Sequence, residues 1–211
     1  MLSLDIFDET FIEILELNKF SLIEDQKRKN KFIMKLDIDF SDCLQVYRLS
    51  EMHDEHSKIK FLCYTEYPDG VFIKQMGKGI YKVIIVELKK NATNHLDKIP
   101  KQLHSGLLHA ISLIELSHTV IDGIDNITSE DIDITYDFYV GSASPEIREL
   151  HKKTVPGTLS PKQKRYTYYL NNEVYHCIKK DKILNFIIKK IQFEKIENQY
   201  EYEEYYSSVT M

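Results

Sequence analysis

The sequence contains only three cysteines, and this scarcity excludes several classes of site. Cys43, Cys63 and Cys177 are far apart and odd in number, and none belongs to a Cys-x-x-Cys pair or to a Cys/His spacing typical of a zinc site. Such cysteine usage fits a reducing compartment better than a disulfide framework. The sequence also lacks a Gly-x-Ser-x-Gly motif and a Cys/His pairing, so nothing in it indicates acyl transfer.

Long apolar runs are missing as well. No uninterrupted apolar stretch is long enough to span a bilayer, and the N-terminus carries acids where a signal peptide needs a basic start. We therefore expect a cytoplasmic protein without a membrane partner. The 211 residues, 43% of them hydrophobic, predict one globular domain over 1–196 with a sizeable core. The acidic, tyrosine-rich tail 197–211 is expected to be mobile.

The net charge of −5 conceals a strong asymmetry along the chain. Residues 1–147 contain 16 Lys/Arg against 25 Asp/Glu, whereas residues 148–190 contain 11 against 3. Because phosphate binding depends on the local field, a polyanion would be drawn to the second segment. A lysine-rich solvated surface is the alternative interpretation, and composition does not separate the two.

Hydrophobic periodicity predicts two helices in the first two-thirds of the chain. One is a short amphipathic helix over 8–19. The other is a long helix over 99–117 that Asn94 or Asp97 would cap, with Pro100 in its first turn, where a missing N–H is harmless.

Alternating or β-rich composition predicts the strands. The segments with this signal are 31–40, 59–66, 70–75, 81–88 and 131–141. The segment 43–58 either starts as a strand and finishes as a loop or belongs to a helix over about 41–55, and the segment 183–196 is compatible with helix or strand. The segment 165–180 has Asn171-Asn172 between two β-rich arms and is typical of a hairpin.

Two acids and a lysine stand at the ends of neighbouring predicted strands. Asp69 lies in a Pro-Asp-Gly turn that opens one strand, while Glu87 and Lys89 end the apolar strand that follows. Because side chains alternate along a strand, Glu87 and Lys89 should share a face while Leu88 points into the core. Each feature alone is common on ordinary surfaces. Their joint arrangement, with Gln102 in the next helix, favours a functional site over an ordinary surface.

This ordered set, over about residues 59–140, resembles the PD-(D/E)XK nuclease superfamily. The resemblance implies an α/β fold of the mixed α+β kind, in which helices flank a central mixed β-sheet. A restriction-endonuclease-like core would then carry a basic C-terminal elaboration over 148–190. It also implies a metal-dependent nuclease that hydrolyses phosphodiester bonds of DNA with Mg²⁺, for which Mn²⁺ can substitute.

The same resemblance assigns roles to individual residues. Asp69 and Glu87 would bind the metal together with the backbone carbonyl of Leu88. Lys89 would orient the attacking water or stabilise developing charge, and Gln102 would position water or phosphate. The family often adds an acid from an upstream helix, for which the sequence offers three candidates: Glu51, Asp54 and Glu55.

If the protein is a nuclease, the basic segment is predicted to bind its substrate, because cations that flank a Pro/Gly loop suit contacts with a sugar-phosphate backbone. The candidates are Arg148, Lys152, Lys153, Lys162, Lys164 and Arg165. Tyr166, Tyr168 and Tyr169 fit either base stacking or packing at the edge of a core. A catalytically inactive nuclease-fold module that binds nucleic acid or a protein partner stays open as an alternative, and so does a homodimer.

Overall fold

The computed structural model describes most of the chain. The described residues are 2, 11–26, 32–50, 66–122, 126–129, 131–144, 159–179, 182–197 and 202–211. They form a mixed α/β structure that is mostly strand, with two helices, α1 (Ile99–Ser117) and α2 (Pro161–Leu170), and a short 3₁₀ turn, η1 (Ala92–Asn94).

A seven-stranded mixed sheet forms the centre, in the order β1-β4-β5-β6-β9-β11-β10. Its strands are β1 (Ile12–Ile14), β4 (Gln45–Leu49), β5 (Gly70–Gly77), β6 (Ile80–Lys89), β9 (Asp133–Ser142), β10 (Glu173–Lys179) and β11 (Lys182–Gln192). β1, β4, β5 and β6 pair antiparallel, whereas β9 is parallel to β6 and to β11. Parallel neighbours need a crossover, which α1 supplies between β6 and β9.

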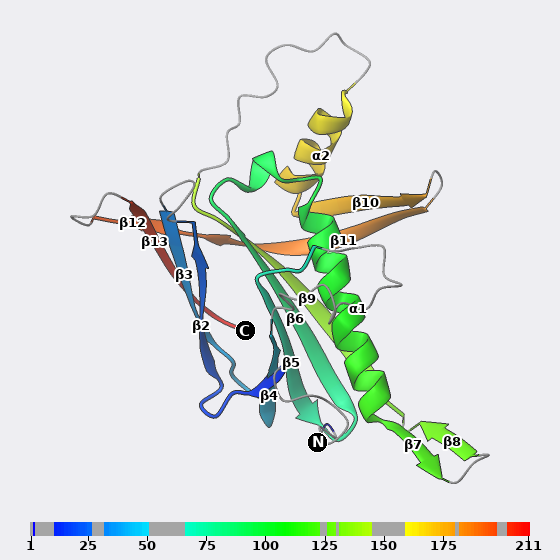
Figure 1. The fold of residues 1–211 in the computed structure, drawn as a ribbon. Coiled ribbons are helices and arrows are strands. Elements are labelled where there is room, and N and C mark those ends of the chain that lie inside the picture. Colours follow the sequence, from blue (N-terminus) through cyan, green and yellow to red (C-terminus); the bar gives the residue numbers. More distant parts are fainter. Residues whose placement is uncertain are drawn as a thin grey trace.

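A second, four-stranded sheet covers one face of the large sheet, and α1 covers the other (Figure 1). Its order is β12-β13-β3-β2. Its strands are β2 (Lys19–Asp25), β3 (Phe32–Asp39), β12 (Glu194–Ile196) and β13 (Glu203–Thr210). A small hairpin of β7 (Thr119–Asp122) and β8 (Asn126–Ser129) follows α1, and α2 lies against β10. The result is a helix, sheet, sheet arrangement with two apolar cores.

Strand β6 contributes to both cores. Val83 and Ile85 belong to the core beneath α1, while Ile84, Val86 and Leu88 belong to the core between the sheets. A strand buried on both faces needs apolar residues at successive positions, which explains its uninterrupted Val-Ile-Ile-Val run. The predicted inward orientation of Leu88 is confirmed, and alternation therefore places Glu87 and Lys89 on the α1 side.

Much of the predicted secondary structure is confirmed. The segments 70–75, 81–88 and 131–141 lie in β5, β6 and β9, the segment 31–40 contains β3, and the long predicted helix is α1. The residue preceding α1 is Lys98, and neither Asn94 nor Asp97 caps it. The expected mixed α/β chain is likewise confirmed, although a sheet rather than a helix covers the second face. The predicted strand 59–66 lies almost wholly outside the described residues.

The predicted helix over 8–19 is wrong for its described part. Residues 12–14 form β1, and Asn18, with φ 50°, turns the chain into β2. Ile14 and Leu17 are 46% and 81% exposed while Leu15 is buried, so the apolar residues of this segment do not share one face as a helix would require. Pairing with β4 outweighs the weak helical spacing of this short segment.

Two predictions near the C-terminus are also wrong. Residues 161–170 form helix α2, so Asn171-Asn172 follows a helix and the hairpin is instead built from β10 and β11. Residues 203–210 of the expected mobile tail form β13, which pairs with both β12 and β3. Because β10 and β11 complete the central sheet, these two strands belong to the fold itself, and the expected basic elaboration over 148–190 is not confirmed.

Candidate active site

Glu87 and Lys89 meet at the carboxyl end of β6, as alternation predicts. The Lys89 Nζ contacts the Glu87 Oε1 and lies 3.0 Å from the backbone carbonyl oxygen of Leu88, to which it donates. The Glu87 side chain is completely buried, while that of Lys89 is 18% exposed. An acid and its cation therefore form a largely desolvated pair.

Asp69 joins this pair from the neighbouring strand. The β5–β6 register places Gly70 opposite Val86, which brings the preceding Asp69 beside the end of β6. Its Oδ2 accepts a hydrogen bond from the backbone N–H of Leu88 at 2.6 Å and lies 3.8 Å from the Lys89 Nζ. The structure thus brings together the predicted group of two acids, a lysine and a backbone carbonyl.

The charge on Glu87 is poorly stabilised by the protein. Neither of its carboxylate oxygens makes a hydrogen bond of good geometry with the described residues. Burial and the negative charge of Asp69 raise its pKa well above the usual value, and Lys89 and the nearby backbone N–H of Asp69 only partly oppose this. Positive charge in addition to that of Lys89 would therefore stabilise the ionised form of this carboxylate.

Lys89 remains charged in this setting. Burial lowers its pKa, but the charges of Glu87 and Asp69 outweigh burial, so the net shift is upward. Glu24 of β2 contributes in the same direction. No sequence pattern singles out Glu24, since its charge acts on Lys89 only because the four-stranded sheet packs against the central one.

The donor atoms around Lys89 fit a hard divalent cation. Asp69, Glu87 and Leu88 present only oxygen, the ligand type that Mg²⁺ prefers. Among the described residues no group of three His, Cys, Asp or Glu side chains could hold a metal ion. A metal here would thus rely on two carboxylates, the Leu88 carbonyl and water. The three candidate upstream acids, Glu51, Asp54 and Glu55, lie outside the described residues.

Gln102 supports the turn that carries Asp69. Its Nε2 donates to the backbone carbonyl oxygen of Tyr67 at 3.2 Å, while its Oε1 is buried without a hydrogen-bond partner in the described structure. One side of this amide therefore anchors the chain just before Pro68. The structure does not bring Gln102 into hydrogen-bond contact with Asp69, Glu87 or Lys89 among the bonds it describes.

Gly106 allows α1 to approach the same turn. A Cβ at this position would lie 2.7 Å from the Pro68 Cγ and 3.0 Å from a methyl carbon of Val71. Such distances leave no room for a side chain, so the close packing of α1 on the Pro-Asp turn depends on glycine. No sequence pattern distinguishes Gly106 from other helical glycines, because the requirement arises from the contact.

Three of the predicted nucleic-acid contacts lie on α2, where Lys162 and Lys164 are exposed and Arg165 is half-buried. Burial lowers the pKa of His176 on β10, and the charges of Lys101 and Arg165 lower it further. The charges of Arg165 on α2 and of Lys101 in the first turn of α1 therefore both act on His176. The other three candidates, Arg148, Lys152 and Lys153, lie outside the described residues.

The tyrosines of α2 were expected either to stack on bases or to pack at the edge of a core, and they differ in exposure. Tyr166 and Tyr169 are each 1% exposed and belong to the core beneath α1 and α2. Tyr168 is 43% exposed and packs edge-on against Tyr175. Core packing is therefore the correct interpretation for Tyr166 and Tyr169.

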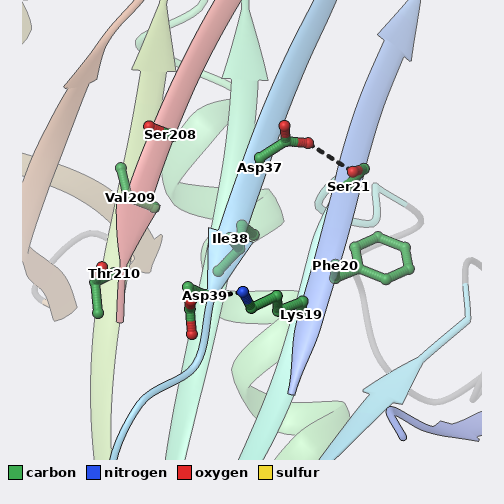
Figure 2. Close-up of a pocket in the computed structure, with 9 residues that line it drawn as sticks. All are labelled: Lys19, Phe20, Ser21, Asp37, Ile38, Asp39, Ser208, Val209 and Thr210. Carbon is green, nitrogen blue, oxygen red and sulfur yellow. Dashed lines mark hydrogen bonds and ion pairs between the residues drawn. The ribbon is translucent and has the colours of Figure 1, made fainter. Parts of the chain in front are cut away.

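A separate hollow of about 610 Å³ lies along β2, β3 and β13 (Figure 2). Its polar side chains pair with one another: Ser21 donates to Asp37 at 2.5 Å, and Lys19 lies 3.3 Å from Asp39. The hydrogen bond from Ser21, despite some burial, lowers the pKa of Asp37. Because these charges already have partners, the hollow is a weaker candidate for chemistry.

Comparisons with protein-family models, curated proteins and solved structures found no match to this chain. Within the described ranges, neither helix is both long and apolar enough to cross a bilayer.

Proposed function

We propose that the protein is a Mg²⁺-dependent nuclease that hydrolyses phosphodiester bonds of DNA. The observation that carries the proposal is the convergence of Asp69, Glu87 and the Leu88 carbonyl on the Lys89 ammonium at the end of β6. A buried carboxylate such as that of Glu87, whose oxygens lack hydrogen bonds of good geometry with the described residues, suits a cation-binding role better than a structural one. The β5-β6-α1-β9 connectivity supports the resemblance to the PD-(D/E)XK superfamily.

Each residue has a role that its position allows. Asp69, Glu87 and the Leu88 carbonyl would hold Mg²⁺, which when bound would neutralise charge on the phosphate oxygens. The ammonium of Lys89, at the partly exposed side of the cluster, would stabilise negative charge as the phosphodiester bond breaks. Gln102 would keep the Asp69 turn in place through the Tyr67 carbonyl.

The experiment uses purified protein with DNA and either Mg²⁺ or Mn²⁺. We expect cleavage, and we expect Mn²⁺ binding measured by calorimetry. Both should be lost in Asp69→Asn and retained in Asp37→Asn, a matched variant on the outer face of β3 whose acid already has partners. Undiminished Mn²⁺ binding by Asp69→Asn, with the fold verified by circular dichroism, would contradict the proposed ligand set.

A second function is favoured by one observation. Lys89 already interacts with both Asp69 and Glu87, so the cluster is partly neutralised without a metal. This arrangement suits a catalytically inactive nuclease-fold module that binds nucleic acid or a protein. DNA binding without Mn²⁺ binding or cleavage would support the module and exclude the enzyme.

A further inference from the structure

Strand β9 is paired unequally with its two neighbours. With β6 the pairing runs over all ten residues, from Asp133 to Ser142. With β11 it begins only at Phe138, opposite Ile188. The earlier part of β11 continues with β10 and turns away from β9, as Figure 1 shows. The two strands therefore part inside the sheet and leave a notch, defined here as 133–137 of β9 and 183–187 of β11.

The notch contains a cavity of about 520 Å³, which is within the size range of ordinary ligand sites. On the α1 side its walls are mostly apolar, with Leu107, Tyr136 and Leu184 around the rim and buried Phe186 beneath, and His104 of α1 adds one polar ring. On the other side lies Ile187, which is 76% exposed, as against 56% for Tyr136. Large apolar side chains are thus exposed together on both faces of the notch.

The main chain at the notch offers a second kind of contact. In a strand, alternate residues direct their N–H and C=O groups toward the neighbouring strand. On the notch side of 133–137 and of 183–187, no described residue pairs with these groups. Two edges of this kind are a template for a further extended chain, which would gain main-chain hydrogen bonds along its length.

The closed end of the notch carries charge. The Lys189 Nζ lies 2.8 Å from the Asp137 Oδ2, and the Lys82 Nζ lies 2.6 Å from the same oxygen. Two lysines against one aspartate leave a net positive charge where β9 and β11 join. An acidic group on an occupant would complement this charge.

We propose that the notch binds an extended polypeptide segment of a protein partner by β-strand addition. Its apolar side chains contact the α1 side, and an acidic side chain lies at the closed end near Lys189. Exposed Tyr136 offers a ring on which a nucleobase could stack, but Phe138 and Phe186 are only 4% and 5% exposed and pack edge-to-face against each other. The unpaired main-chain groups favour a polypeptide, because an extended chain would pair with them along its length. The inference does not rest on the proposed nuclease activity, because the unpaired edges and the cavity do not involve the Asp69 cluster.

The test uses the full-length chain and a pool of fluorescent peptides of about nine residues, a common strand length. The peptides alternate Val, Leu or Phe with Thr, Glu or Lys. We expect acid-containing members to bind, as measured by anisotropy, and to slow hydrogen exchange of the notch-facing amides in 133–137 and 183–187. N-methylation of alternate peptide amides should weaken binding about tenfold or more, because it removes strand pairing while keeping the side chains.

Variants at exposed tyrosines give the matched comparison. Tyr136→Asp should weaken peptide binding about tenfold or more, whereas Tyr168→Asp, at a tyrosine of similar exposure on α2, should leave it unchanged. Four outcomes would overturn the proposal: no peptide binds, N-methylated peptides bind equally well, the notch-facing amides of both segments already exchange slowly in the free chain, or a single-stranded oligonucleotide displaces the peptides.

Discussion

The carboxyl end of β6 and the outer face of β3 contain nearly the same triplet in opposite polarity. Glu87–Lys89 and Lys35–Asp37 each place a completely buried leucine between an acid and a lysine. On β3, Asp37 is 35% exposed at its side chain and accepts hydrogen bonds from Ser21 and Tyr206. On β6, the Glu87 side chain is fully buried and lacks hydrogen bonds of good geometry.

The two acids consequently differ in their pKa. Hydrogen bonds outweigh partial burial and lower the pKa of Asp37, whereas burial raises that of Glu87. An acid that accepts hydrogen bonds, such as Asp37, is stable as part of the solvated surface. A buried acid without such hydrogen bonds, such as Glu87, is stabilised by added positive charge. The surroundings of the triplet, and not the triplet itself, distinguish a candidate site from solvated surface.

The largest expected effect is on catalysis. Lys89→Ala should lower the rate of DNA cleavage about 100-fold to 1,000-fold, because it removes a cation that acts on developing negative charge. Lys35→Ala changes the lysine of the matching triplet and should leave the rate unchanged. Single-turnover cleavage at saturating Mg²⁺ measures both. Equal rates for the two variants would remove Lys89 from the proposed mechanism.

The same pair of variants should differ in metal-free stability. Lys89→Ala leaves Glu87 buried without its cation and should cost about 3 kcal/mol of unfolding free energy, whereas Lys35→Ala should cost less than about 1 kcal/mol because its ion pair is exposed. Denaturant titration in EDTA measures this difference. Saturating Mn²⁺ should then stabilise Lys89→Ala by restoring positive charge, and no such gain in that variant would count against a metal at the cluster.

A smaller effect is expected from filling the space between α1 and the Asp69 turn. Gly106→Ala should destabilise the protein by about 1–2 kcal/mol, because overpacking against Pro68 outweighs the gain in helix propensity. Gly77→Ala is the comparison, since its nearest contact would be an ordinary 3.5 Å. Thermal unfolding measures both variants. If Gly106→Ala also lowers the affinity for Mn²⁺ and Gly77→Ala does not, close packing of α1 maintains the site.

The smallest effect concerns the two ion pairs of Glu203 on β13, one with Lys90 just after β6 and one with Lys195 on β12. Lys195 and Lys90 hold the pKa of Glu203 at about 2, so its contribution to stability is present above its ordinary value of 4.5 and is lost as the pH falls toward 2. Glu203→Gln should therefore lose less than about 1 kcal/mol at neutral pH, because the group is partly exposed. The difference from the parent should vanish near pH 2. A constant difference in urea titrations from pH 7 to pH 2 would show that the pairs contribute nothing.

Several elements could be predicted because their signals are local. The apolar run of β6 and the glycines that flank β5 make a strand pair predictable, and so does the stripe along α1. Helix α2 also had a local signal: Ser160 and Gln163 form a capping box with Pro161 at the first helical position. The β-rich composition of 165–170, followed by Asn171-Asn172, favoured a hairpin instead.

Other features depend on residues distant in sequence. The tail forms β13 because it pairs parallel with β3, and burial of Tyr205 and Met211 holds it there despite its acids. No property of the tail alone distinguishes a strand of this kind from a solvated segment. The effect of the Glu24 charge on Lys89 and the separation of β9 from β11 have the same non-local origin.

By itself the sequence determined the strand-turn-strand-helix order around Asp69, Glu87 and Lys89 and, through alternation, the shared face of Glu87 and Lys89. Tertiary structure decided that these groups meet in a buried cluster, that a second sheet covers the opposite face, and that the tail belongs to it. The physical reason is that periodicity fixes the direction of a side chain relative to its own strand. Desolvation and partner charges arise only when distant segments pack against it.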